Sequence, residues 1–147
     1  MELPEELAGR SPEEVLAFVR EADDDALRAA VHGIGTPVVL DLLFTGMAGR
    51  FEADPRRRAA RLAFVLEDDG VEHERVLELD AQGARVVAPG PRARATLRAT
   101  LVRFLRVAAG AADPKWMFLT GALRIGGDPL WAARTLGGMS SPGRPPA

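Results

Sequence analysis

Few side chains in this sequence are suited to acid–base or metal chemistry. The chain has 147 residues, with two histidines and no cysteine. His32 and His73 lie far apart, and no further ligands follow them at the spacing of a zinc site. The lack of cysteine excludes disulfides and thiolate catalysis, and no G-x-S-x-G, phosphate-loop or H-E-x-x-H motif occurs. We therefore expect no metal site, no cofactor and no catalytic residues.

Charge and composition narrow the class of protein further. The formal net charge is -2, so the chain has no overall attraction to nucleic acid or to an anionic membrane. We find no apolar run of membrane-spanning length and no apolar leader, and we expect a cytoplasmic protein. Lys115 is the one lysine, and the other cationic residues are arginines. Together with abundant Ala and Gly, this favours a GC-rich bacterial source, actinobacterial in our interpretation.

The elements that must position any site begin with three helices. Ser11-Pro12 and Thr36-Pro37 each offer an N-cap followed by a favoured first residue, which predicts helices from 12 and over 37–50. A short helix between them should start at Asp23 or Asp24 and end at Gly33, with His32 in its last turn, where the helix dipole favours it. The helix over 37–50 is apolar around most of its circumference. It must be covered on two sides, either within a core or between a sheet and a cavity.

The pattern then changes to the alternation that is typical of strands. Leu62, Phe64 and Leu66 point one way in the first strand, over 61–68, and Asp69-Gly70 predicts a hairpin turn. Further strands are expected at 71–79, 84–87, 94–99 and 122–126, and further helical segments at 101–109, 114–119 and 129–136. This order predicts an α+β fold, in which a largely antiparallel sheet carries helices on one face.

The stretch RATLRATLVRFLRVAAGAADPKWMFLTGALRIGGDPLWAARTLGGM, residues 94–139, resembles the sterol carrier protein type two domain. It has that family's ungapped order of strand, capped helix, Asp-Pro, paired apolar residues, polar residue plus Gly, alternating strand and last helix. The residues from 36 onward resemble the family's first helix and first three strands. The resemblance divides the chain into an N-terminal helical extension (1–35), a sterol carrier protein-like domain (36–139) and a disordered tail (140–147).

The resemblance also implies a function. Its members have a five-stranded sheet that encloses an apolar cavity, and they bind fatty acyl chains, acyl-CoA, sterols or phospholipids without covalent catalysis. We expect a cavity of about 300 to 1,000 Å³ between the sheet and the helices at 37–50 and 129–137. Its candidate wall residues are Leu43, Met47, Phe64, Phe104, Trp116, Phe118, Thr120, Leu123, Leu130, Trp131 and Met139. Thr120 stands where the family often has a longer glutamine, and the large apolar residues could equally be core.

The sequence leaves three functions open. The first is a non-enzymatic binder or carrier of an apolar small molecule such as a lipid. The second is a small enzyme of lipid or polyketide metabolism, whose acid or base would be His73, Asp41 or Glu74. The third is an accessory module that docks on a larger lipid-metabolising enzyme, or pairs with a second copy of itself. The N-terminal helices favour a docking role slightly, and they could instead cover the mouth of the cavity.

Overall fold

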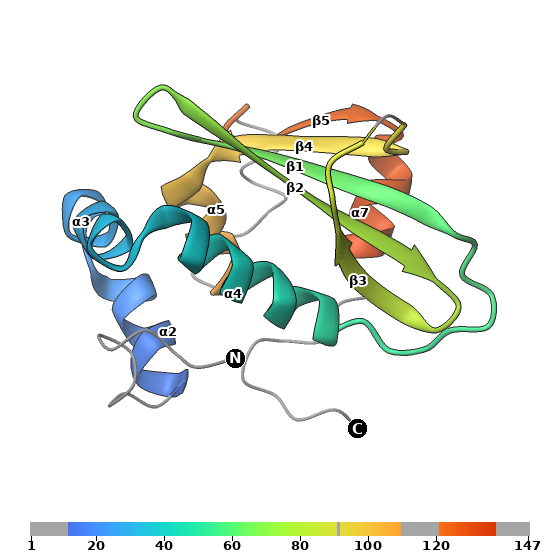
Figure 1. Cartoon of the computed structure of the whole chain (residues 1–147), viewed down its shortest axis with the longest axis horizontal. Coiled ribbons are helices and arrows are strands. Elements are labelled where there is room, and N and C mark those ends of the chain that lie inside the picture. The colour runs from blue at the N-terminus through green and yellow to red at the C-terminus, as the bar shows by residue number, and fades with distance from the viewer. Residues whose placement is uncertain (1–11, 91, 110–120, 138–147) are drawn as a thin grey trace.

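The computed structural model describes residues 12–90, 92–109 and 121–137. The elements are α2 (Pro12–Glu21), α3 (Asp24–Ile34), α4 (Thr36–Gly49), β1 (Ala60–Asp68), β2 (Val71–Asp80), β3 (Gly83–Val87), β4 (Ala95–Thr100), α5 (Leu101–Ala108), β5 (Arg124–Gly127) and α7 (Pro129–Gly137). Five strands form one sheet in the order β3-β2-β1-β4-β5 (Figure 1). All neighbours are antiparallel except β1 and β4, which run parallel. The predicted α+β fold is thus confirmed.

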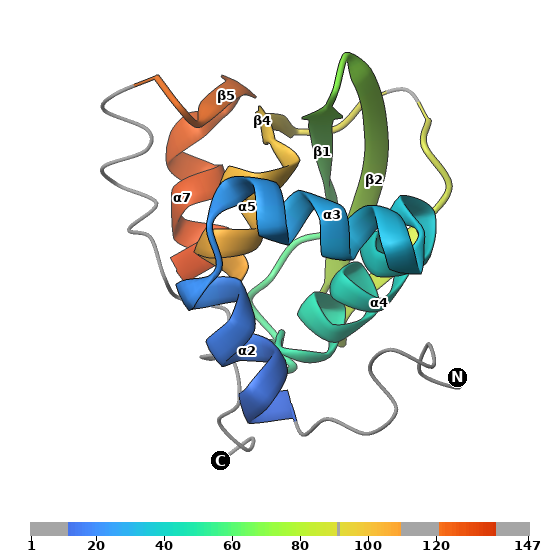
Figure 2. The ribbon, with the colours of Figure 1, turned by 90° about the vertical axis from the view of Figure 1, so that its left-hand side faces the viewer.

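The helices lie together on one side of the sheet (Figures 1 and 2). Leu62, Phe64 and Leu66 of β1 point toward them and are fully buried, as the alternation predicted. These leucines and Phe64 share one apolar cluster with residues of α3, α4, α5 and α7. The core therefore sits between the sheet and the helices, which is where the cavity was expected.

The opposite face of the sheet is partly covered by the chain itself. The segment from β3 to β4 must pass β2 and β1, and it crosses them on this outer face (Figure 1). The backbone N–H of Arg94 donates to the carbonyl of Arg61 at 2.8 Å, which holds the end of the crossing in place. Val65 and Val76 are buried although they point outward, so the two faces differ less in polarity than strict alternation predicts.

Two helix boundaries differ from the sequence prediction. The helix α3 continues past Gly33 to Ile34, and Asp23 is its cap, since its side chain accepts from the backbone N–H of Ala26 at 2.7 Å. Thr36 is the first residue of α4 and not its cap; the cap position is Gly35, with φ 111. Such a positive φ costs little only for glycine, so Gly35 is where the chain turns from α3 into α4.

The described turn at Asp69-Gly70 and the cap of α5 agree with the sequence, while β5 is shorter than expected and the predicted cap Ser11 lies outside the described residues. Asp69 and Gly70 have φ values of 50 and 80 and form the predicted hairpin turn. Thr100 caps α5 by accepting from the N–H of Arg103 at 3.3 Å. The last strand begins at Arg124 rather than at 122. The expected helical turn at 114–119 and the tail at 140–147 lie outside the described residues.

The apolar helix α4 is covered on more than one side, although Val38 near its start is 44% exposed. Leu40, Phe44, Met47 and Ala48 are buried, and the helix packs on β2, β3 and α3. Within the described ranges, no single helix has both the length and the apolar character to cross a membrane. Only α3 and α4 taken together satisfy that test, and they are bent by 97°.

Candidate apolar binding site

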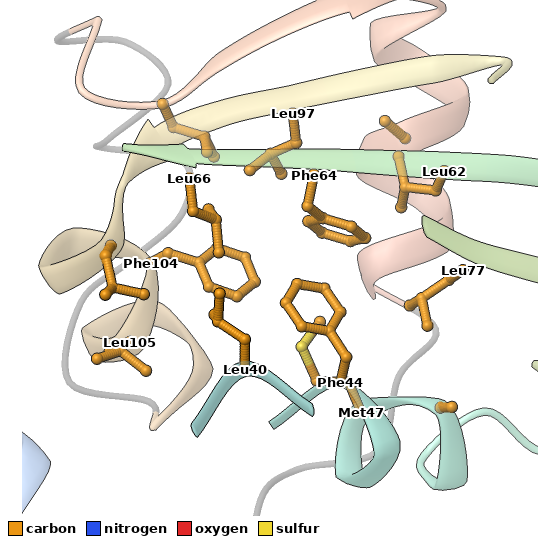
Figure 3. Close-up of a cluster of buried hydrophobic side chains, with 14 of the residues drawn as sticks. Leu40, Phe44, Met47, Leu62, Phe64, Leu66, Leu77, Leu97, Phe104 and Leu105 are labelled. Carbon is orange, nitrogen blue, oxygen red and sulfur yellow. The ribbon is translucent and has the colours of Figure 1, made fainter. Parts of the chain in front are cut away.

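Three phenylalanines from three elements meet at the centre of the inner layer (Figure 3). The ring centroids of Phe44 and Phe64 are 4.9 Å apart, those of Phe44 and Phe104 5.6 Å, and those of Phe64 and Phe104 5.5 Å. Two of these contacts are edge-to-face and one is stacked, which are the arrangements that aromatic rings prefer. The inner layer is therefore built around an aromatic centre.

Local sequence explains why these three rings converge. Phe64 occupies an inward position of the central strand β1, and Phe44 lies on the face of α4 that contacts the sheet. Phe104 lies on the buried face of α5, together with Leu101 and Leu105. The helix α5 begins directly after β4, which is the parallel neighbour of β1, so Phe104 is brought back beneath the sheet.

Six of the candidate wall residues gather in or against this cluster. Met47, Phe64, Phe104 and Leu123 are buried members of it, and Leu43 and Trp131 are partly buried against it. Leu130 is 74% exposed and lies outside the cluster. The structure therefore brings the sheet, α4, α5 and α7 together at one apolar region. Four candidates fall outside the described residues, namely Trp116, Phe118, Thr120 and Met139.

Trp131 lies at the rim of this region and joins it to a charged neighbour. The guanidinium of Arg94 lies over its ring at 5.0 Å from the centroid, a cation–π contact. The guanidinium of Arg94 also forms an ion pair with the carboxylate of Asp128 at 3.1 Å. The same carboxylate accepts a hydrogen bond from the backbone N–H of Trp131 at 3.0 Å. The hydrogen bond from the backbone N–H of Trp131, together with the hydrogen bond and charge of Arg94, lowers the pKa of Asp128 below its usual value. One side of the Trp131 ring thus faces the apolar cluster, and the other is covered by Arg94, which an ion pair with Asp128 holds in place.

Close backbone packing fixes this corner further. Gly127 has φ 81, and a Cβ atom there would lie 2.4 Å from the carbonyl oxygen of Arg94. Only glycine fits between β4 and the start of α7. The end of β5 and the first turn of α7, which carries Trp131, are therefore held directly against β4.

Charge is kept away from the aromatic centre. Among the described residues, Asp68 is the one buried polar side chain, and it lies at the hairpin end of β1. His32 of α3 binds it through Nε2 at 2.7 Å, and Nε of Arg28 lies 3.6 Å from its other oxygen. Sequence reasoning placed His32 at a helix end but missed this partner, because the two residues are 36 positions apart.

The ligand atoms of His32, Asp68 and Asp69 lie within 4.8 Å of one another, close enough to hold a metal ion. Arg28 already supplies a cation there, since its Nε lies 3.6 Å from Asp68 and 3.8 Å from Asp69. A metal ion would have to bind against this guanidinium charge. The arrangement suits an ion-pair network between α3 and the hairpin.

The three candidate acids or bases, Asp41, His73 and Glu74, lie on α4 and β2. Asp41 is paired with Arg75 at 3.3 Å on the surface of α4 and β2. His73 and Glu74 are neighbours in β2, so they point to opposite faces of the sheet. These three candidates do not form one constellation.

Comparison with solved structures finds a similar fold both as nearly a whole chain and as a minor part of larger enzyme chains. The solution structure of palmitated SCP2L2 from Aedes aegypti matches with a TM-score of 0.54 at 13% identity, over 67% of this chain and 88% of that one. The sec-alkylsulfatase Pisa1 from Pseudomonas sp. matches with 0.57 at 22% identity, over 76% of this chain and 17% of that one. The MycE methyltransferase of the mycinamycin biosynthetic pathway matches with 0.56 at 14% identity, over 71% and 26%.

The chain thus spans about a sixth of the length of the alkylsulfatase chains it matches. At these identities the likeness establishes the fold alone. No curated protein was found to match the sequence. The profile of the SCP-2 sterol transfer family, however, matches residues 51–135, from the end of α4 through most of α7. The matched residues include all five strands of the sheet and the phenylalanines Phe64 of β1 and Phe104 of α5. Because the match covers more than half of the chain, the chain belongs to the SCP-2 sterol transfer family.

Proposed function

We propose that this chain binds an apolar small molecule of the lipid class, without covalent catalysis, between the sheet and the helices. The observation that carries the proposal is the aromatic centre of Phe44, Phe64 and Phe104, which three separate elements build beneath the sheet. Membership of the SCP-2 sterol transfer family supports a lipid ligand. The relative solved in palmitated form, SCP2L2 of Aedes aegypti, shows this fold with a fatty acyl group.

Hydrophobic burial alone supplies enough affinity for such a ligand. Each methylene group removed from water contributes about 0.8 kcal/mol, so roughly ten buried methylenes give about 8 kcal/mol before the costs of binding. A net free energy of that size corresponds to a micromolar dissociation constant, so a buried chain longer than ten methylenes is needed to offset the freedom that the ligand loses on binding. A charged partner in the wall is therefore not required, which agrees with a region where the polar groups lie at the rim.

The placement of Trp131 suggests how the ligand enters. Its ring is partly buried against the cluster, in the first turn of α7, and Arg94 covers the other side. A ligand that separates α7 from the cluster would change the surroundings of this ring. We propose Trp131 as a wall residue at the entrance, with Arg94 as the nearest cation for a carboxylate or other polar head.

A second candidate function is that of a module within, or docked on, a larger enzyme. Two of the matched structures are an alkylsulfatase and a methyltransferase, and in each the similar region is a minor part of the chain. In that role the same apolar region would hold or shield part of an apolar substrate. The chemistry would then be carried out by the rest of the enzyme.

Titration with an environment-sensitive fatty acid analogue tests the proposal. We expect saturable one-to-one binding, weakened at least about tenfold, or 1.4 kcal/mol, in Trp131→Ala. The matched control is Val71→Ala, which truncates a 55% exposed side chain at the β1–β2 hairpin and should bind as the parent does. Circular dichroism of each variant separates lost binding from lost folding. Equal affinity of folded Trp131→Ala and the parent would make Trp131 a core residue and contradict its role in the wall.

A further inference from the structure

A pocket of about 300 Å³ lies at one end of the sheet, and none of the three central phenylalanines lines it. It forms where the ends of β1 and β4 meet the start of β5 and the first turn of α5. Five charged residues line it, namely Glu67, Glu72, Arg98, Arg103 and Arg124. Glu67, Arg98 and Arg124 alternate along their strands with the inward-pointing Leu66, Leu97 and Ile125. Ala99 and Ala122 line the pocket and also pack against the apolar cluster, so the pocket lies at the edge of the apolar region.

Two of these arginines oppose one another across the sheet. Arg98 of β4 and Arg124 of β5 are direct register partners in an antiparallel pair. Side chains in such a position have Cβ atoms about 5 Å apart, and like charges there are destabilising. Arg98 forms an ion pair with Glu72, in which its Nη1 lies 3.4 Å from a carboxylate oxygen. Within the described part of the chain, Arg124 has no acidic partner.

The third arginine is also placed against the local electrostatics. Arg103 is the third residue of α5, after the cap Thr100, and the first turn of that helix has no acidic residue. The N-terminus of a helix carries a partial positive charge, so a cation there is unfavourable and an anion is favoured. Arg103 likewise has no acidic partner among the residues that the structure describes.

The two acidic groups of the pocket are already engaged. Glu67 accepts from the backbone N–H of Gly70 at 3.1 Å, within the hairpin turn, and Glu72 accepts from Arg98. Two unfavourable placements, a like-charge pair and a cation at a helix N-terminus, therefore converge on one concave site. An anion would relieve both, and departures from local rules of this kind gather at functional sites.

We propose that this pocket binds a phosphate-type anionic group, held by Arg103 and Arg124 at the N-terminus of α5. Guanidinium groups match phosphate oxygens in geometry and bind them through two hydrogen bonds each. None of the central phenylalanines lines the pocket, and a lipid-free anion can be used as the probe, so the proposal is tested independently of the proposed lipid binding. The phosphate is carried either by a small soluble ester or by a lipid headgroup.

Inorganic pyrophosphate, titrated into the full chain at low ionic strength, is the first probe. Calorimetry should show saturable binding, weakened at least about tenfold in the double variant Arg103→Gln/Arg124→Gln. Arg56→Gln/Arg58→Gln is the matched control, because both arginines are exposed and lie outside the pocket, and the pair loses two positive charges as the double variant does. Pyrophosphate should raise the midpoint of thermal unfolding of the parent and of Arg56→Gln/Arg58→Gln, but not of Arg103→Gln/Arg124→Gln.

A purely structural role for the arginines predicts a loss of stability when one of them is removed. The proposal predicts otherwise: because Arg124 opposes Arg98 when no anion is bound, Arg124→Gln should leave the unfolding midpoint at low salt unchanged or raise it. A lowered midpoint would assign Arg124 a structural role and contradict the proposal. Vesicles of phosphatidylcholine with and without phosphatidic acid then separate the two sources. Pyrophosphate-sensitive binding to the acidic vesicles assigns a lipid headgroup, and binding to pyrophosphate without vesicle binding assigns a soluble ester. No pyrophosphate binding by the parent, or equal binding by the double variant, would overturn the proposal.

Discussion

At the scale of single residues, two threonines show how similar sequence signals give different structures. Thr36 and Thr100 both precede a helical stretch, and threonine is a favoured cap at that position. Thr100 does accept from the N–H of Arg103, whereas the cap position of α4 belongs to Gly35 and Thr36 is already helical. The difference arises because Gly35 adopts a positive φ that the turn between α3 and α4 requires, a tertiary demand that the local motif does not contain.

Matched substitutions at these threonines test this reading of the caps. Thr100→Ala should lower the free energy of unfolding by about 1 kcal/mol, since the N–H of Arg103 loses its acceptor. Thr36→Ala should change it by about 0.5 kcal/mol or less, because no cap bond is lost. Urea denaturation of the two variants beside the parent measures both values. An equal loss in both would mean that Thr36 caps its helix after all.

At the scale of elements, α3 is attached to the hairpin of β1 and β2 by charge as well as by packing. His32 and Arg28 meet the buried carboxylate of Asp68, while Leu27 and Val31 of the same helix enter the core. The sequence could predict each element here, but not the pairing between a helix and a turn far along the chain. Such contacts depend on how the elements pack, and periodicity carries no information about that.

The two histidines provide the test of this attachment. His32→Ala should cost about 1 to 3 kcal/mol, because the buried Asp68 loses a hydrogen-bond partner. His73→Ala, half-buried near a strand end, should cost about 1 kcal/mol or less. Hydrogen exchange should speed up selectively in α3 for His32→Ala. If the exchange rate in that variant rises no more in α3 than in the sheet, apolar packing alone holds the helix.

The attachment of α7 should depend on pH through Asp128. The N–H of Trp131, together with Arg94, lowers the pKa of Asp128 below 3.8, so its charged form favours the folded state. This contribution is present at neutral pH and down to about pH 4, and it is lost as the pH falls through the lowered pKa. Asp128→Asn keeps a cap acceptor but not the charge. We expect a flatter loss of stability below pH 4 in Asp128→Asn, and an unchanged acid profile would contradict this assignment.

At the scale of the whole molecule, the sequence predicted the sheet, its alternation and the order of the helices. Most of the described candidate wall residues lie in or against the apolar cluster, because inward positions of strands and buried faces of helices follow from periodicity, while their role in a ligand-binding wall stays a prediction. Leu130 shows where this reasoning stops. It is apolar and next to Trp131, yet it faces solvent, since only the crossing of α7 over β4 and β5 decides which side of its first turn is covered.

The charged pocket lined by Arg98, Arg103 and Arg124 could not be predicted from the sequence for a related reason. Arg98 and Arg124 are 26 residues apart, and only the register of β4 and β5 places them opposite one another. Arg103 joins them because α5 begins directly after β4. The molecule thus has an apolar layer beneath the sheet and a charged pocket at the edge of that layer.

The central claim is that the region around Phe44, Phe64 and Phe104 accepts an apolar molecule. Native mass spectrometry of the purified chain, before and after addition of a long-chain fatty acid, tests it most directly. We predict a complex with one apolar molecule per chain, either co-purified or formed on addition, and lost on extraction with organic solvent. A folded chain that carries no such molecule and takes up none when it is offered would contradict the account.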